Sequence, residues 1–435
     1  MLISSTRFAL AAVALLAGCG QTAEPTSAPT GADEAVAASA VQAAPSAPAV
    51  EGVSFEAALA ALDETITRSS ELTAAQPESW MRLEIVANLY LQRARLGGDL
   101  NDYAEAEALL EQAFELAPEG SGPLLSRAQL NYSLHRIPLV AADLDAASRA
   151  LLADDNLRAD LLRRQGNLAM QTGDYGGALD AYEASLALHP SYATVCDLAQ
   201  ARRRTGDYDA AEALFDRAEG MYHGLNPEPK AWLHLQRAIL DLDRGSLEAM
   251  LSHLDDADGV MTGWWLVDEH RAEALTLLGR ADEAEPIYVA VIEGTGKPEY
   301  MDAMAEVLAE RGDEAGASAW IEKGEAIYEA QLAQFPEAAA GHALGHYLAF
   351  GPEDRALALA RANAALRPNG EARIQLAEAL LASGEIAAAR VEIEAVLASA
   401  WRSPELYEVA GAIYDEVGEP ALAEVQREAG EGFGG

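Results

Sequence analysis

The chain has 435 residues, of which 50% are hydrophobic, so it holds enough apolar material for a large buried core. Aromatic residues make up only 6%, and the abundance of alanine favours close-packed helices over a β-sandwich. The formal net charge of −40 argues against nucleic-acid binding, and the two cysteines, Cys19 and Cys196, are too few for a disulfide framework or a cysteine-based zinc site.

The chain opens with MLISSTRFALAAVALLAGCG, in which Arg7 precedes an apolar run from Phe8 to Ala17. That run is too short for a membrane-spanning helix, which takes ~20 residues. The segment ends in Leu-Ala-Gly-Cys and resembles the lipobox signal of bacterial lipoproteins, which implies a signal peptide at 1–18 and a lipidated Cys19. An ordinary cleaved signal with an incidental cysteine is the alternative. In the lipoprotein family, Gly20 in place of aspartate implies the outer membrane, facing the periplasm.

Residues 19–52 are rich in alanine, proline, serine, threonine and glycine. Such a composition buries too little apolar surface to offset the entropy of ordering. We therefore expect a disordered tether that holds the folded part away from the lipid, followed by an N-terminal capping helix in the region 53–79.

From residue 80 onward the sequence repeats. Turn glycines recur 33 to 39 residues apart, and five residues after each comes a small or slim residue. The glycines are Gly173, Gly206, Gly245, Gly279, Gly312, Gly351, Gly384 and Gly418. A fixed period of this length is typical of stacked helix pairs. The two periods of 39 residues indicate longer loops or longer second helices.

The segment 159–190 resembles the tetratricopeptide repeat, with a small residue in the first helix, glycine in the turn, alanine and an aromatic in the second helix, and a final proline. The resemblance implies an all-α fold, a right-handed α-solenoid of about ten helix pairs over 80–430, with a flexible C-terminus at 431–435. It also implies a concave groove lined by the first helix of each pair.

The same resemblance implies a peptide-binding surface in that groove. The residues expected there are Arg163, Asn167, Gln171, Gln200, Arg203 and Arg204. Arg163 and Asn167 resemble half of the carboxylate clamp with which some family members hold a peptide C-terminus. Asp197 stands where the next pair should supply a second asparagine. The alternative is that the arginine stems cover apolar surface and pair with Asp160 or Asp207.

Catalytic and metal motifs are sparse. His342 and His346 lie at i and i+4, on one helix face, but a third ligand is not evident. The sequence contains no nucleophile elbow and no phosphate-binding glycine loop. We therefore predict a non-catalytic lipoprotein, without a cofactor or bound metal, that binds an unidentified protein or peptide and no small-molecule substrate. Two alternatives stay open, namely a metal-binding or enzymatic module using the histidine pair, and a purely structural spacer.

Overall fold

The computed structural model describes residues 52–150 and 154–431. The expected signal peptide, Cys19, the tether up to residue 51 and residues 432–435 lie outside the described residues. Within them, the fold is all-α apart from two short strands, β1 (Val53–Ser54) and β2 (Met261–Thr262). The helices are α1 (Phe55–Ala74), α2 (Trp80–Gly97), α3 (Leu100–Leu116), α4 (Leu124–Ser133), α5 (Ile137–Ala150), α6 (Asp155–Thr172), α7 (Tyr175–Leu188), α8 (Tyr192–Arg204), α9 (Tyr208–Met221), α10 (Glu228–Asp243), α11 (Leu247–Val260), α12 (Trp265–Leu277), α13 (Ala281–Thr295), α14 (Pro298–Glu310), α15 (Glu314–Gln334), α16 (Pro336–Phe350), α17 (Glu353–Leu366), α18 (Gly370–Ala382), α19 (Ile386–Leu397), α20 (Pro404–Glu416) and α21 (Pro420–Glu431).

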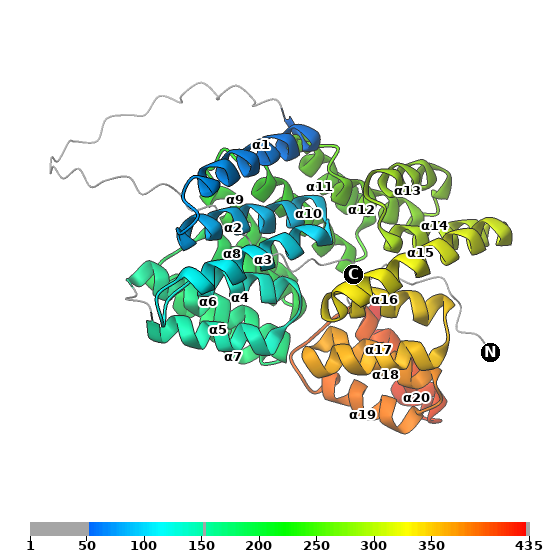
Figure 1. The fold of residues 1–435 in the computed structure, drawn as a ribbon. Helices are drawn as coiled ribbons and strands as arrows, with labels where there is room; N and C mark the ends of the chain where they lie inside the picture. The colour runs from blue at the N-terminus through cyan, green and yellow to red at the C-terminus, as the bar shows by residue number, and fades with distance from the viewer. Residues whose placement is uncertain (1–51, 151–153, 432–435) are drawn as a thin grey trace, which may run out of the picture.

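Helix α1 packs on α2, and the helices after it pack as consecutive pairs, from α2 with α3 to α20 with α21 (Figure 1). Each pair then stacks on the next, as a repeat that cannot bury its apolar faces alone requires. The predicted α-solenoid of about ten helix pairs is therefore confirmed.

Glycine ends most of the first helices. Seven of the eight predicted turn glycines have φ between 69° and 82°, the left-handed conformation that glycine adopts without a steric cost. The exception is Gly351, whose φ is −105° and ψ is −174°. Pro352 follows it, and a residue before proline is pushed toward extended backbone.

Small residues in the second helices lie against the neighbouring helix. Ala178, Ala211 and Ala284 are fully buried at the predicted position, and so are the aromatic rings of Tyr182 and Phe215, one turn later in their helices. The two periods of 39 residues were predicted to contain a longer loop or a longer second helix, and one of each is present. Residues 222–227 form a loop before α10, and the second helix α15 extends over 21 residues.

The solenoid contacts itself near its beginning. Strand β1 pairs in parallel with β2, which lies about 200 residues further along the chain. The indole N–H groups of Trp264 and Trp265 both donate to the carbonyl of Leu96, at 3.2 and 3.0 Å, and the ammonium of Lys297 donates to the carbonyl of Gly98 at 3.0 Å. Helices α1 and α2 are thereby joined to the region around α11–α14 (Figure 1).

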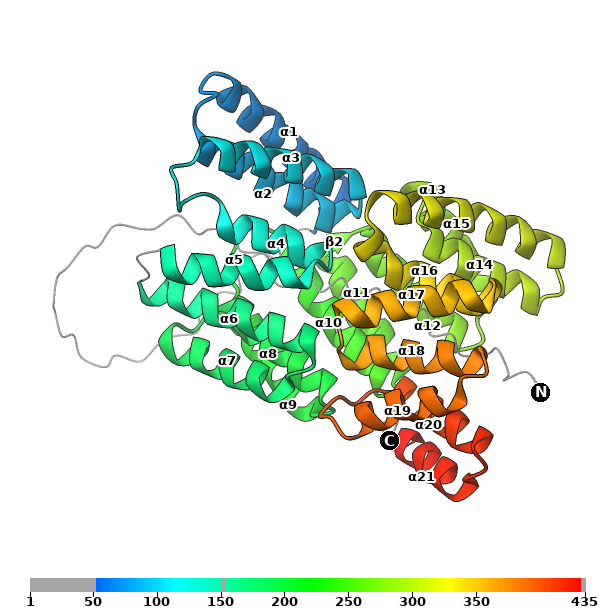
Figure 2. The same cartoon turned by 60° about the horizontal axis from the view of Figure 1, so that its bottom comes forward.

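A second set of self-contacts joins the two columns of helices that lie side by side in Figure 2. The amide of Gly370 donates to the hydroxyl of Tyr175 at 2.6 Å, and the amide of Arg402 donates to the carbonyl of Arg204 at 2.9 Å. The ring of Trp401 lies 5.7 Å from that of Tyr175. The start of α18 and the loop before α20, which we call the C-terminal arm, therefore lie against α6–α8.

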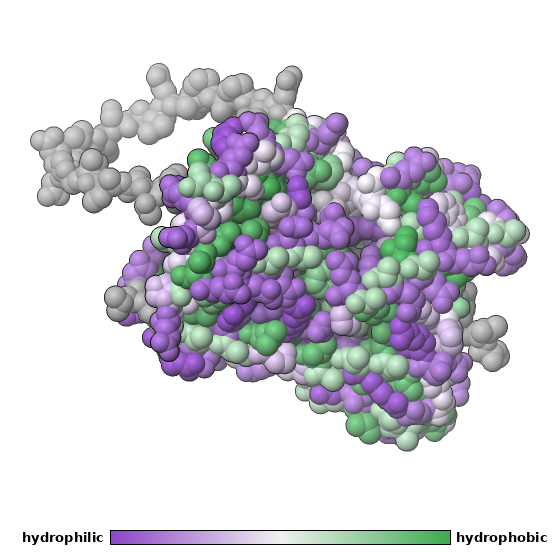
Figure 3. All heavy atoms as spheres, viewed as in Figure 1, coloured by the Kyte–Doolittle hydropathy of each residue, from purple (hydrophilic) through white to green (hydrophobic). Residues whose placement is uncertain are grey.

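The face shown in Figure 3 mixes hydrophilic residues with smaller apolar patches. Exposed apolar side chains include Met81 and Ile85 on α2. Among the described residues, no helix is both long enough and apolar enough to cross a membrane.

Candidate binding pocket in the groove

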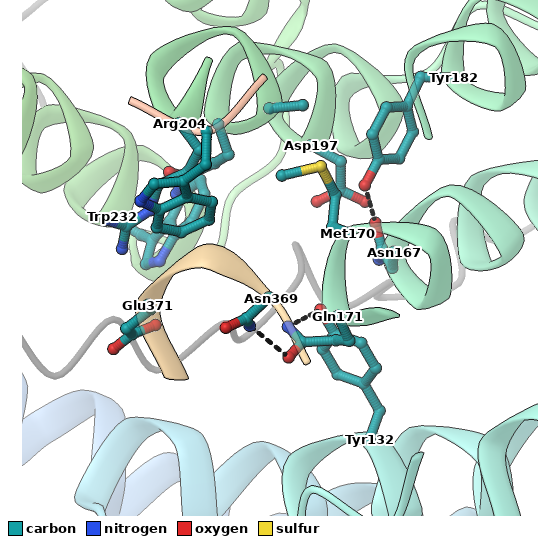
Figure 4. A pocket seen from close by; sticks show the side chains of 13 residues that line it. Tyr132, Asn167, Met170, Gln171, Tyr182, Asp197, Arg204, Trp232, Asn369 and Glu371 are labelled. Atoms are coloured by element: carbon teal, nitrogen blue, oxygen red, sulfur yellow. Dashed lines mark hydrogen bonds between the residues drawn. The ribbon is translucent and has the colours of Figure 1, made fainter. Parts of the chain in front are cut away.

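A pocket lies where the first helices α6, α8 and α10 meet the C-terminal arm (Figure 4). It holds about 570 Å³ of space that no atom fills, part of it open to solvent. Its lining residues are Tyr132, Asn167, Met170, Gln171, Tyr182, Asp197, Gln200, Ala201, Arg204, Trp232, Asn369, Glu371 and Trp401.

Four of the six residues predicted for the peptide-binding surface line this pocket, namely Asn167, Gln171, Gln200 and Arg204. Their amides are positioned by neighbouring side chains. The hydroxyl of Tyr182 donates to Asn167 Oδ1 at 2.6 Å, Gln171 Nε2 donates to the hydroxyl of Tyr132 at 3.2 Å, and Gln200 Nε2 donates to Gln236. The polar groups of the pocket wall are therefore held in place by hydrogen bonds.

The other two predicted residues lie behind the wall. Arg163 is 3% exposed, and its guanidinium contacts Asp160 and Asp197, each at 2.8 Å. Burial by itself would raise the pKa of Asp160, but Arg164 and Arg163 lower that pKa to about 2. These charge pairs connect α6 to α8, and the burial of Arg163 between the two carboxylates makes it inaccessible to a ligand.

Arg203 is similarly enclosed. It is 1% exposed and pairs with Asp243 at 2.7 Å, and burial lowers its pKa. The alternative from the sequence was that these arginines pair with Asp160 or Asp207. Arg163 does pair with Asp160, whereas Asp207 lies 3.8 Å from Arg202.

Arg204 differs from its neighbours. It is the last residue of α8, and its guanidinium carbon lies 5.1 Å from the ring centre of Trp401. Among the described residues, no carboxylate oxygen lies within ion-pair distance of this guanidinium. An arginine placed in this way keeps its donors available, and stacking on an indole adds a cation–π attraction.

The C-terminal arm supplies pocket residues that the sequence reasoning missed. Asn369 Nδ2 donates to Gln171 Oε1 at 3.3 Å, while Asn369 Oδ1 caps α18 by accepting from the amide of Ala372 at 3.0 Å. An asparagine before a helix is a recognisable cap signal. That signal gives no indication of which distant helix the residue will contact.

The histidine pair lies away from this pocket, on α16. His342 Nδ1 lies 3.1 Å from Glu299, and His346 Nδ1 lies 2.8 Å from Asp302. Burial alone would raise the pKa of Glu299, but the hydrogen bond and charge of His342 lower it to about 2. The two histidines thus contact different carboxylates of α14. In the described part of the chain, no group of three histidine, cysteine or acidic side chains is arranged to hold a metal ion.

Two segments match models of the tetratricopeptide repeat, residues 87–119 and residues 159–192. The first begins within α2 and includes all of α3, and the second begins in α6 and ends at the start of α8, so it includes pocket residues. No curated protein sequence matches the chain.

Several solved structures have a similar arrangement of helices. A tetratricopeptide repeat protein from Parabacteroides merdae has 16% identity and a TM-score of 0.33, covering 64% of this chain and 94% of its own. Yeast Tom70 has 15% identity and a TM-score of 0.43, covering 86% and 88%. The APC/C component Cut9, solved with Hcn1, has 11% identity and a TM-score of 0.39, covering 87% and 80%. At these sequence identities and TM-scores, the specific functions of those proteins cannot be assigned to this chain. The chain is an α-solenoid that contains tetratricopeptide repeats, which generally mediate protein–protein interactions.

Proposed function

We propose that this chain is a lipid-anchored envelope protein that binds a protein or peptide non-catalytically through the pocket formed by α6, α8, α10 and the C-terminal arm. The observation that carries the binding role is the position of Asn167, Gln171, Gln200 and Arg204, which line a single pocket. A concave site with a few fixed polar groups and aromatic walls is the usual form of a recognition site.

The anchor rests on the sequence of the first twenty residues, which resembles a lipobox ending in Cys19. Several acyl chains, each buried CH₂ worth ~0.8 kcal/mol, would hold the chain on a membrane without a spanning helix. The position of Gly20 favours the outer membrane, and the tether would place the solenoid in the periplasm.

The binding role is tested by photo-crosslinking in intact cells. A benzoylphenylalanine placed at Gln200 should crosslink one or a few defined proteins, identified by mass spectrometry. The matched control is the same group at Asp180, an exposed position of α7 in the adjacent pair. Identical crosslinking patterns at the two positions, or no crosslink at Gln200, would favour a structural spacer over a binding protein.

A further inference from the structure

Two oppositely charged side chains in the pocket have no oppositely charged partner in the part of the chain that the structure describes. Arg204 comes from α8 and Glu371 from the first turn of α18, and both line the pocket. Within the described residues, neither makes an ion pair, and they lie beyond ion-pair distance of each other. Figure 4 shows Arg204, Trp232 and Glu371 on one side of the pocket and Asn167 and Tyr182 on the other.

A shortage of acidic partners does not explain why Arg204 is unpaired, because the chain has 70 acidic and 30 basic residues. The adjacent Arg202 and Arg203 both pair with carboxylates. Burial raises the pKa of Glu405, and the charge of Arg204 only opposes that rise, because Glu405 lies beyond ion-pair distance of Arg204. The dipoles of α8 and α18 favour a cation and an anion at these two helix ends, yet they leave the charged atoms themselves unpaired.

An independent observation concerns the indole of Trp401. This residue is 3% exposed, and its Nε1–H is buried with no acceptor among the described residues. The ring cannot move far, because its face lies on Gly370, where an added Cβ would stand 2.2 Å from the indole, and Arg204 stacks on it. The ring of Trp401 therefore serves as a fixed support that holds the Arg204 guanidinium at the pocket wall.

From these observations we infer that the pocket takes an amino-acid or peptide group carrying both a carboxylate and a basic nitrogen. The carboxylate accepts from the Arg204 guanidinium, which the ring of Trp401 holds in place. The basic nitrogen lies toward Glu371, beside the ring of Trp232, which adds a cation–π contact. This inference rests on the proposed binding role of the pocket and names the chemistry of what binds there.

The probe is N-acetyl-Gly-Gly-Lys, which has one carboxylate and one ammonium group. Its two analogues are the C-terminal amide, which lacks the carboxylate, and the norleucine peptide, which lacks the ammonium. Titration calorimetry on the full chain should show saturable binding of the parent peptide. Each analogue should bind about 10-fold or more weakly, the order expected for a lost charged hydrogen bond.

Two variants test which residue binds the carboxylate of the peptide and which binds its ammonium group. Arg204→Gln should bind the parent peptide and the amide equally weakly, and Glu371→Gln should no longer distinguish lysine from norleucine. Arg217→Gln, on the exposed surface of α9, is the matched control and should bind as the unmodified chain does. Circular dichroism and urea unfolding check that every variant is folded.

Absence of saturable binding, or equal binding of all three peptides, would overturn the inference. It would also be overturned if Arg204→Gln or Glu371→Gln kept the full discrimination. If Gln200 still crosslinks a partner in cells while the tripeptide fails to bind, only the ligand chemistry is wrong. If neither the crosslinking at Gln200 nor the peptide titration shows binding, the proposed binding role is wrong as well.

Discussion

Adding one methyl group at Gly166 tests the helix contact on which the repeat is built. A Cβ at this position of α6 would stand 2.6 Å from the ring of Tyr182, closer than carbon atoms approach in folded proteins. The ring cannot easily move away, because it is 2% exposed and its hydroxyl is bonded to Asn167. Gly166→Ala therefore forces the α6–α7 pair apart.

The magnitude follows from two opposing effects. Alanine in a helix interior is favoured over glycine by ~1 kcal/mol, whereas overpacking costs ~1–3 kcal/mol. Gly345, in the interior of α16, has no atom within 4 Å of its added Cβ and is the matched control. Gly345→Ala should thus stabilise by ~1 kcal/mol, and Gly166→Ala should be less stable than that control by ~1–3 kcal/mol.

The assay is urea unfolding of both variants, combined with hydrogen exchange in α6 and α7, because repeat proteins open locally. Gly166→Ala should speed exchange in this pair only. In a Gly166→Ala, Tyr182→Leu double variant, the two losses should sum to more than the measured loss, since the smaller side chain leaves room for the methyl group. Equal stability of the Gly166→Ala and Gly345→Ala variants would refute the packing argument.

Three further predictions concern the self-contacts, the carboxyl group of Glu306 on α14 and the anchor. Tyr175→Phe leaves the buried amide of Gly370 without an acceptor and should destabilise the C-terminal arm by ~1–3 kcal/mol, seen as faster exchange at the start of α18; unchanged exchange there would contradict the role of this hydrogen bond. Burial, with the charge of Asp302, raises the pKa of Glu306 from its ordinary 4.5 to about 7, so the folded form keeps this proton at higher pH than the unfolded chain. The stability that the raised pKa of Glu306 contributes is therefore present below about pH 4.5 and lost as pH rises through 7, and urea unfolding of Glu306→Gln should lack this decline; a decline of the same size in the variant would show that other groups cause it. Cys19→Ala should release the protein from the membrane fraction, and the anchor is wrong if the variant still sediments with membranes while the unmodified protein carries no lipid mass.

The sequence by itself determined the repeat and its helix pairs. Turn glycines such as Gly173, buried alanines such as Ala178 and rings such as Tyr182 act within about one period of the chain. Their conformational and packing requirements are local, so spacing alone reveals them. The same local register placed Asn167, Gln171, Gln200 and Arg204 on first helices.

Only the tertiary structure decided how the two columns of helices meet. The path of a solenoid is the sum of small rotations at each interface, and no single repeat encodes that sum. The path of the solenoid places β1 beside β2 and the C-terminal arm against α6–α8. The arm adds Trp401 and Glu371 to the pocket. The same packing enclosed Arg163 and Arg203 with carboxylates and, among the described residues, gave Arg204 no carboxylate partner. Side-chain pairing of this kind depends on which distant helix lies opposite.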